Sequence, residues 1–337
     1  MRILGIESSC DETAAAVCDG MRVISSVVNS QIDIHKKYGG VVPEVAARSH
    51  IEVVNAVIDE AVSDWNEIDA IAVTYAPGLI GSLMVGTLTA RTLALLKNKP
   101  LYPVHHIRAH IYANFIDNPH LQFPILALVV SGGHTELIFI KDHTDFRMVG
   151  STKDDAAGEC FDKVAKILGL PYPGGPSVAK AAKLGDENAY ELPKPKLSTP
   201  YDFSFSGLKT ALLRATQKAI GQDFSFPSTE IAKRLSQKQK RDFAASFQKT
   251  AVAVLVNELL IAEKNLCPKT VVLAGGVSAN QKLREEVTKR VKNTPVYFPK
   301  PELCTDNAVM VAASAYFQIK NGAKPADPRN FDIFPTK

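Results

Sequence analysis

The chain has 337 residues, 46% of them hydrophobic and 22% charged, which is ordinary for a globular protein and long enough for two domains. A formal net charge of +4 permits contact with a polyanion without requiring it. No apolar run approaches about 18 residues, and the N-terminus has no cleavage site, so we expect neither a membrane-spanning helix nor a signal peptide.

The cysteines also bear on location. Five are scattered along the chain, an odd number without a CxxC pair. This usage is typical of a reducing compartment rather than of a disulfide framework, so we expect a cytoplasmic protein without membrane attachment.

The first half of the chain alternates short apolar runs with segments of helical spacing. Three runs separated by turn residues predict an antiparallel meander, and strands followed by helices come after it. The predicted strands are 2–7, 14–19, 23–30, 68–75 and 101–105, and the predicted helices cover 43–63, a stretch ending at Leu95, and one opening at His106.

The second half repeats this order, which indicates a weak internal duplication. The predicted strands are 125–130, 135–141, 146–151 and 270–273, and the predicted helices are 158–168, 177–183, 241–265 and 306–321. Two similar halves that face each other across a cleft are typical of the actin-like ATPase fold (the ASKHA superfamily of sugar kinases and Hsp70). We therefore predict an α/β protein with two duplicated RNase H-like lobes.

The lobe boundaries follow from the same pattern. The N-terminal lobe is expected to cover residues 1–105 plus roughly 318–337, and the C-terminal lobe residues 106–317. Within the latter, residues 192–240 are poorly patterned and rich in Pro, Ser, Lys and Gln. We interpret them as an irregular or partly helical basic insertion, either ordinary solvated surface or a contact for RNA phosphates.

His106 and His110 are spaced four residues apart at the start of a predicted helix. On a helix that spacing places both imidazoles on one face, where they can chelate one metal ion. A chance pair of half-buried histidines is the alternative. Ile107 follows the first histidine, so the glutamate of the HExxH peptidase signature is missing.

Asp306 is the candidate third ligand, because two histidines and one carboxylate are a common set for iron or zinc with open positions. The competing interpretation is that Thr305 or Asp306 merely caps the helix that follows. The sequence alone leaves these two alternatives open.

Two glycine-rich turns occupy matching positions in the halves, at residues 131–134 and 274–280. Glycine lets the backbone approach a ligand closely, and the N-terminus of the following helix favours an anion. Two such turns favour a bound nucleotide over plain tight turns, with Asn280 near a ribose or base. Elsewhere, Asp11 and Glu12 place carboxylates at a hairpin tip, and Asp162 has the chemistry to bind sugar hydroxyls.

Nine short strings occur in order along nearly the whole chain: GIESSCDET at 5–13, YGGVVPE at 38–44, APGL at 76–79, VSGGHT at 130–135, GECFDK at 158–163, YPGGP at 172–176, FSFSGLKT at 203–210, GGVSAN at 275–280 and CTDN at 304–307. Taken together, these strings closely resemble one family, the TsaD tRNA threonylcarbamoyladenosine transferases, whose archaeal and eukaryotic relatives belong to the KEOPS complex.

The resemblance implies a metal centre and a nucleotide site. It assigns one divalent ion per subunit, Fe²⁺ favoured and Zn²⁺ the alternative, to His106, His110 and Asp306. It also places Asp11 and Glu12 where the family has residues needed for turnover. The residues implied to contact the substrate are Val129, Val130, Ser131, Gly132, Gly133, Asp162, Gly175 and Asn280.

The implied reaction moves a threonylcarbamoyl group from threonylcarbamoyl-AMP to the exocyclic amine of the adenosine 3′ of the anticodon, in tRNAs that read codons beginning with A. A TsaB-like paralogue and a TsaE-like ATPase are the implied partners. One departure is that Ile107-Arg108-Ala109 replaces the family's usual Met-Glu-Gly between the histidines. A small-molecule kinase of the same fold and a metallopeptidase remain the alternatives.

Overall fold

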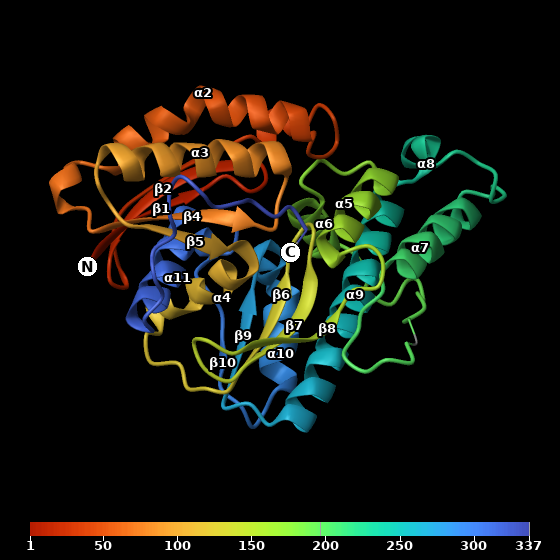
Figure 1. The fold of residues 1–337 in the computed structure, drawn as a ribbon. Coiled ribbons are helices and arrows are strands. Elements are labelled where there is room, and N and C mark those ends of the chain that lie inside the picture. Colours follow the sequence, from red (N-terminus) through yellow and green to blue (C-terminus); the bar gives the residue numbers. More distant parts are fainter. Residues whose placement is uncertain (196, 337) are drawn as a thin grey trace. The chain divides into compact units, whose positions relative to one another are not determined.

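The computed structural model describes residues 1–195 and 197–336. The chain forms two compact units, each with its own five-stranded sheet (Figure 1). Unit 1 comprises Met1–Leu121, Lys141–Asp145 and Pro299–Lys337, and unit 2 comprises Gln122–Ile140 and Phe146–Phe298.

In unit 1 the first three strands form an antiparallel meander, and the next two run parallel to β1, giving the order β3-β2-β1-β4-β5. The strands are β1 Arg2–Glu7, β2 Glu12–Asp19, β3 Arg22–Ser30, β4 Ala70–Ala76 and β5 Leu101–His105. The helices are α1 Ile32–His35, α2 Pro43–Ala61, η1 Trp65–Glu67, α3 Ile80–Leu96, α4 His106–Asp117, η3 Pro301–Leu303 and α11 Ala308–Lys320.

The period-two alternation of the strands divides the core of unit 1 into two layers. Ile3 lies in one layer with α4 and α11, whereas Leu4 lies in the other with α2 and α3. The sheet is therefore covered on both faces, and α4 and α11 share one of them (Figure 1). This common face is what brings the two histidines near the segment that carries Asp306.

Unit 2 has the same topology, with the order β10-β9-β6-β7-β8. An antiparallel meander again comes first, and β9 pairs in parallel with β6. The strands are β6 Ile125–Val130, β7 Thr135–Ile140, β8 Phe146–Ser151, β9 Thr270–Ala274 and β10 Val296–Tyr297. The helices are α5 Ala157–Leu168, α6 Gly174–Ala182, α7 Ser206–Ala219, α8 Ser228–Arg234, α9 Gln237–Leu266, η2 Gly276–Ala279 and α10 Gln281–Arg290. The internal duplication expected from the sequence is thus present in the sheets.

The unit boundaries differ from the expected lobe boundaries at residues 105 and 317. The chain leaves unit 1 after Leu121, returns to it for Lys141–Asp145, and enters it again at Pro299. The physical reason is that α4 and α11 pack together on the sheet of unit 1, through residues such as Ala109, Ala113 and Val311. A pattern of element types does not reveal which sheet a connecting helix covers.

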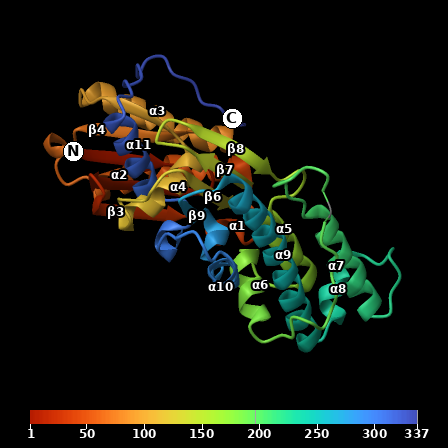
Figure 2. The same ribbon diagram turned by 90° about the horizontal axis from the view of Figure 1, so that it is seen from below.

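The segment 192–240 is partly helical, which is one of the two forms expected from the sequence. It contains α7, which packs against α9, and α8, which packs against α5, all in unit 2 (Figure 2). Phe203 and Phe205 are fully buried in the core of that unit, which agrees with the alternation of the sequence there. Lys196, one of the basic residues of this segment, lies outside the described residues.

Among the described residues, one helix is long and apolar enough to cross a membrane by length and composition. It is α9, and 67% of its most apolar window is buried inside the protein. The core helix of a soluble protein has this property too, and Phe243, Phe247 and Leu255 of α9 pack in the core of unit 2.

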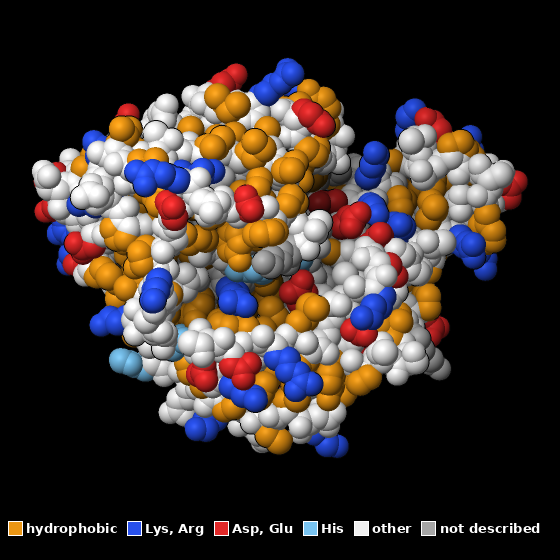
Figure 3. Space-filling model, viewed as in Figure 1, with side chains coloured by type: hydrophobic (Ala, Val, Ile, Leu, Met, Phe, Trp, Pro, Cys, Tyr) orange, Lys and Arg blue, Asp and Glu red, His pale blue; other side chains and the backbone are white. Residues whose placement is uncertain are grey.

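An apolar stripe is exposed on the surface of unit 1. Ile80, Met84 and Leu88 follow one face of α3 at intervals of four residues and are 60%, 47% and 50% exposed. Figure 3 shows hydrophobic side chains gathered over α2 and α3. This face of α3 points away from the core layer that the opposite face of the helix helps to form.

Gly5 allows β1 and α11 to approach closely, and this contact supplies a stability prediction. A Cβ at Gly5 lies 2.3 Å from the Ala308 carbonyl oxygen and 2.9 Å from the Ala312 nitrogen, both backbone atoms. We expect Gly5→Ala to lower the free energy of unfolding by about 1–3 kcal/mol, through overpacking. This change in the free energy of unfolding is measured by urea unfolding followed by circular dichroism. Gly207→Ala is the control, because a Cβ there meets nothing within 4 Å, and an unchanged midpoint for Gly5→Ala would contradict the prediction.

Candidate metal centre

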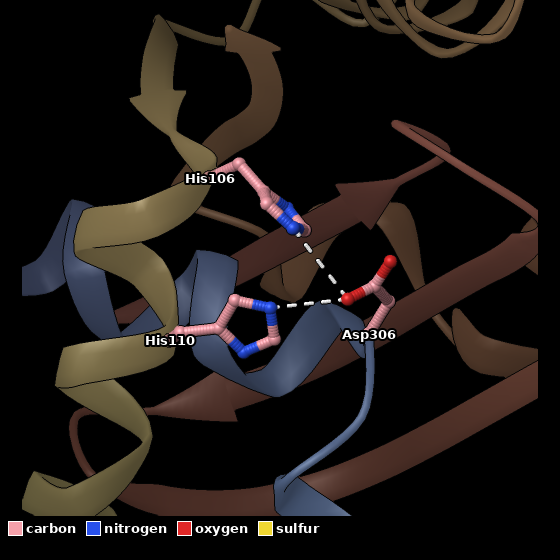
Figure 4. A group of neighbouring side chains, drawn as sticks. All are labelled: His106, His110 and Asp306. Atoms are coloured by element: carbon pink, nitrogen blue, oxygen red, sulfur yellow. Dashed lines mark hydrogen bonds and ion pairs between the residues drawn. The ribbon is translucent and has the colours of Figure 1, made fainter. Parts of the chain in front are cut away.

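The residues proposed as metal ligands converge in unit 1. His106 is the first residue of α4, directly after β5, and His110 follows one turn later. Asp306 lies between η3 and α11. Because α4 and α11 pack on the same face of the sheet, the loop before α11 reaches the histidine face of α4 (Figure 4).

Both imidazoles face the same carboxylate oxygen. Asp306 Oδ1 lies 3.0 Å from His110 Nε2 and 3.5 Å from His106 Nε2, and the two rings are 4.6 Å apart between centroids. The ligand atoms of the three residues lie within 4.8 Å of one another. Figure 4 shows the two rings and the carboxylate pointing toward a common point.

The alternative that Asp306 merely caps α11 is not what the structure shows. The cap is Asn307, whose side-chain oxygen accepts a hydrogen bond from the Met310 backbone nitrogen at 3.0 Å. The Asp306 carboxylate is thereby left to contact the histidines. The sequence pattern indicated a cap in this stretch but placed it one or two residues too early.

The centre is buried, and its negatively charged surroundings favour a positive charge on His106. His106 is 6% exposed and His110 only 1%. Burial lowers the pKa of His106, but the charges of Asp306 and Glu7 and a hydrogen bond to Glu7 outweigh it and raise the pKa to about 9. The site therefore favours a cation between its ligands, either a proton on His106 or a metal ion.

The donor set fits a divalent transition metal. Two imidazole nitrogens and one carboxylate oxygen suit iron or zinc, at bond lengths of about 2.0–2.2 Å. Ligands of one ion then lie at most about 4.4 Å apart. The observed separations of 3.0 and 3.5 Å thus require little rearrangement to bind an ion.

Glu7 is a residue of this centre that the sequence did not single out. Its side chain is fully buried at the end of β1, and its Oε2 lies 3.3 Å from His106 Nδ1. Burial raises the pKa of Glu7, but the charge and hydrogen bond of His106 outweigh this and lower it. The available signal was its position at the end of a buried strand, next to the polar string that follows.

Asp11 and Glu12 lie in the same unit, at the start of β2. The Asp11 carbonyl accepts a hydrogen bond from the Gln31 nitrogen, and Glu12 Oε1 accepts one from the Ser30 hydroxyl at 3.1 Å. Burial, together with the negative charges of Asp306 and Asp11, raises the pKa of Glu12 to about 10. Glu12 is therefore protonated at neutral pH in the metal-free protein.

The expected nucleotide residues all belong to unit 2. Residues 129–133 and Asn280 lie at or after the ends of β6 and β9, whereas Asp162 and Gly175 lie in α5 and α6. Val129 and Val130 are buried in β6, and the turn that includes Gly132 and Gly133 follows. A Cβ on Gly275 meets the Val130 carbonyl oxygen at 2.5 Å, so the β9–α10 turn lies against the end of β6. Both glycine-rich turns therefore lie side by side in unit 2, and the expectation that they occupy matching positions in the two halves is wrong.

The remaining candidates of unit 2 have structural partners as well. Ser131 and Gly132 accept hydrogen bonds from the first turn of α5, through the nitrogens of Gly158 and Glu159. Asp162 Oδ1 accepts a hydrogen bond from Gly174, next to Gly175, at 2.6 Å.

Asn280 caps α10 by accepting from Leu283 and donates to Gln248. Its side chain therefore already has two partners within unit 2. Asp162 and Asn280 thus shape the backbone turns around the expected nucleotide position.

The similarity of this chain to known proteins extends over nearly its whole length. A model of the family described as TsaD, tRNA N6-adenosine threonylcarbamoyltransferase, matches residues 22–313. A protein of Thermosipho africanus named tRNA N6-adenosine threonylcarbamoyltransferase is 49% identical over 329 residues, covering 96% of this chain and 96% of that protein.

Solved structures support the fold. HypF of T. kodakarensis superposes with a TM-score of 0.63 at 13% identity, over 95% of this chain and 48% of that one, so this chain spans about half of that protein. Component A of the Acidaminococcus fermentans (R)-2-hydroxyglutaryl-CoA dehydratase gives 0.55 at 15% identity, over 96% and 100%. At such identities the likeness shows the fold alone, and the actin-like α/β fold expected from the sequence is confirmed.

Proposed function

Since this chain belongs to the TsaD family of tRNA N6-adenosine threonylcarbamoyltransferases, and is thus an enzyme, we propose the full reaction that it catalyses. It transfers the threonylcarbamoyl group from threonylcarbamoyl-AMP to the exocyclic amine of the adenosine 3′ of the anticodon, in tRNAs that read codons beginning with A. The observation that carries the proposal is the meeting of His106, His110 and Asp306 in a chain of this family. A small-molecule kinase has no use for such a ligand set.

The donor is a mixed anhydride whose carbamoyl carbon is already activated, so the protein has to supply position and electrostatics. His106, His110 and Asp306 would hold one divalent ion, Fe²⁺ rather than Zn²⁺ in our proposal, and this ion supplies Lewis-acid polarisation. We assign the AMP moiety to unit 2, with the ribose at Asp162 and Gly175 and the β9–α10 turn at Asn280 beside it. The Ser131-Gly132-Gly133 turn receives developing negative charge.

Asp11 and Glu12 are assigned different roles on the basis of the raised pKa of Glu12. The amine of the acceptor adenosine must lose a proton, which requires an ionised group. Burial is the largest cause of the raised pKa of Glu12 and persists when a cation neutralises Asp306, so we assign Glu12 the role of a hydrogen-bond donor. Asp11 is then the proton acceptor.

This division predicts a contrast between two amide variants. Glu12→Gln replaces a neutral carboxylic acid by a neutral amide, so we expect kcat to fall by less than about fivefold. Asp11→Asn removes the base, and we expect a loss of about 10²–10⁴-fold. Single-turnover transfer to tRNA measures both, and equal losses would contradict the assignment.

The proposal includes partners and a location. We propose that a TsaB-like paralogue and a TsaE-like ATPase act with this chain on tRNA in the cytoplasm, without a membrane. The cleft between two lobes that the sequence suggested stays a prediction.

The test is transfer to a defined tRNA. An unmodified transcript is incubated with threonine, bicarbonate, ATP, an adenylate-forming enzyme and the two partner proteins, with or without this chain. Its nucleosides are then analysed by mass spectrometry, and threonylcarbamoyladenosine is expected only when the chain is present. A transcript with guanosine 3′ of the anticodon is the control, and phosphorylation of a metabolite without a modified nucleoside would favour the kinase alternative.

A further inference from the structure

Glu7 is a fully buried carboxylate that gathers hydrogen-bond donors from separate parts of unit 1. Its Oε1 accepts from the Ser9 backbone nitrogen at 2.5 Å, and its Oε2 accepts from the Thr74 hydroxyl at 2.5 Å. The same Oε2 lies 3.3 Å from His106 Nδ1. The carboxylate therefore links the end of β1, the loop after it, β4 and the first residue of α4.

These contacts fix the orientation of the His106 ring. A carboxylate only accepts hydrogen bonds, so the ring nitrogen that faces it carries the hydrogen. His106 Nδ1 is that nitrogen, and the Ser9 hydroxyl lies 3.1 Å from it as well. In the neutral ring the lone pair is then on Nε2, the atom that lies 3.5 Å from Asp306 Oδ1 and is available to a metal ion.

His110 lacks this support. Its Nε2 also faces Asp306, but its Nδ1 is buried without a hydrogen-bond partner among the described residues. The candidate centre is thus asymmetric, with one imidazole oriented by a buried carboxylate and the other by the helix and Asp306. Removing the carboxylate would leave the Ser9 hydroxyl as the remaining partner of His106 Nδ1 among the described residues.

We propose that Glu7 is a positioning residue of the metal centre, which orients His106 through Nδ1 so that Nε2 is presented beside Asp306. This inference rests on the metal role in the proposed function. A carboxylate behind a ligating histidine orients the ring and raises its basicity, and loss of such a partner typically weakens metal binding 10–100-fold. Through Ser9, the same carboxylate connects the centre to the loop that precedes Asp11.

Glu7→Gln tests this, because it keeps the shape of the side chain and removes its charge. The probe is Co²⁺, whose affinity is measured by competition with a chromophoric chelator and whose visible spectrum reports ligand geometry. We expect roughly 10–100-fold weaker binding and an altered spectrum. Asp242→Asn is the matched control, because Asp242 is also a buried carboxylate that accepts from a backbone nitrogen, but in unit 2. It should bind Co²⁺ within twofold of the wild type.

A folded Glu7→Gln protein with wild-type affinity and spectrum overturns the proposal. Should that variant fail to fold by circular dichroism, Thr74→Val carries the same test, since it removes the hydroxyl that holds Oε2 and leaves the charge. We expect about 3–10-fold weaker Co²⁺ binding, and unchanged binding overturns the role of Glu7.

Transfer to tRNA is assayed separately. If the wild type binds Co²⁺ but does not modify tRNA, the proposed function fails while the role of Glu7 stands, and a wild type that binds no Co²⁺ overturns both.

Discussion

His110→Ala is expected to abolish metal binding and to lower transfer to tRNA by about 10²–10³-fold, with the fold retained. His110 supplies one of two imidazole ligands and lies 3.0 Å from Asp306 Oδ1. The polarising effect of a bound ion is worth several kcal/mol of transition-state stabilisation, and each 1.4 kcal/mol is a factor of ten. Metal analysis of the purified variant and single-turnover transfer measure the two effects.

His143→Ala is the matched control for that variant. His143 is another imidazole of unit 1, but it stacks on Phe317 with ring centroids 4.3 Å apart and is not one of the proposed ligands. It should keep its metal and most of its activity. A His110→Ala protein with full metal content would show that His110 is not a metal ligand.

Metal affinity is expected to rise about 50-fold between pH 7 and pH 9 and to level off above. In the metal-free protein burial lowers the pKa of His106, but Asp306 and Glu7 raise it to about 9. A ligating imidazole must be neutral, so below this pKa each ion displaces one proton and affinity gains about tenfold per pH unit. Chelator competition at a series of pH values measures the slope.

Calorimetry provides a second check of this pH dependence. In buffers of different ionisation enthalpy, binding at pH 7.5 should release about one proton from His106. His106→Gln removes the titrating ring and should flatten the slope as well as weaken binding. A wild-type affinity that does not change from pH 7 to pH 9 would show that His106 is not a ligand with a raised pKa.

Much of the framework of the site was readable from the sequence. The strands 101–105 and 125–130 have the predicted bounds, because short apolar runs bounded by turn residues signal both ends. His106 opens a helix as expected, so the i, i+4 rule placed both imidazoles on one face.

The parts of the site that the sequence alone did not settle depend on tertiary contacts. Asp306 is far from the histidines in sequence, and only the packing of α11 on α4 brings it near them. The same packing shifts the unit boundaries away from residues 105 and 317. Glu7 was not singled out despite its position at the end of a buried strand, because an acidic residue there is ordinarily exposed and its three partners come from separate elements.

The most direct test of the central claim is transfer to tRNA by metal-free protein. The chain is purified without oxygen, stripped with a chelator, and assayed before and after addition of one equivalent of Fe²⁺ or Zn²⁺. We predict that the stripped protein forms no threonylcarbamoyladenosine and that a single equivalent restores the reaction in the wild type but not in His110→Ala. Full activity in protein shown by elemental analysis to hold no metal would contradict the account.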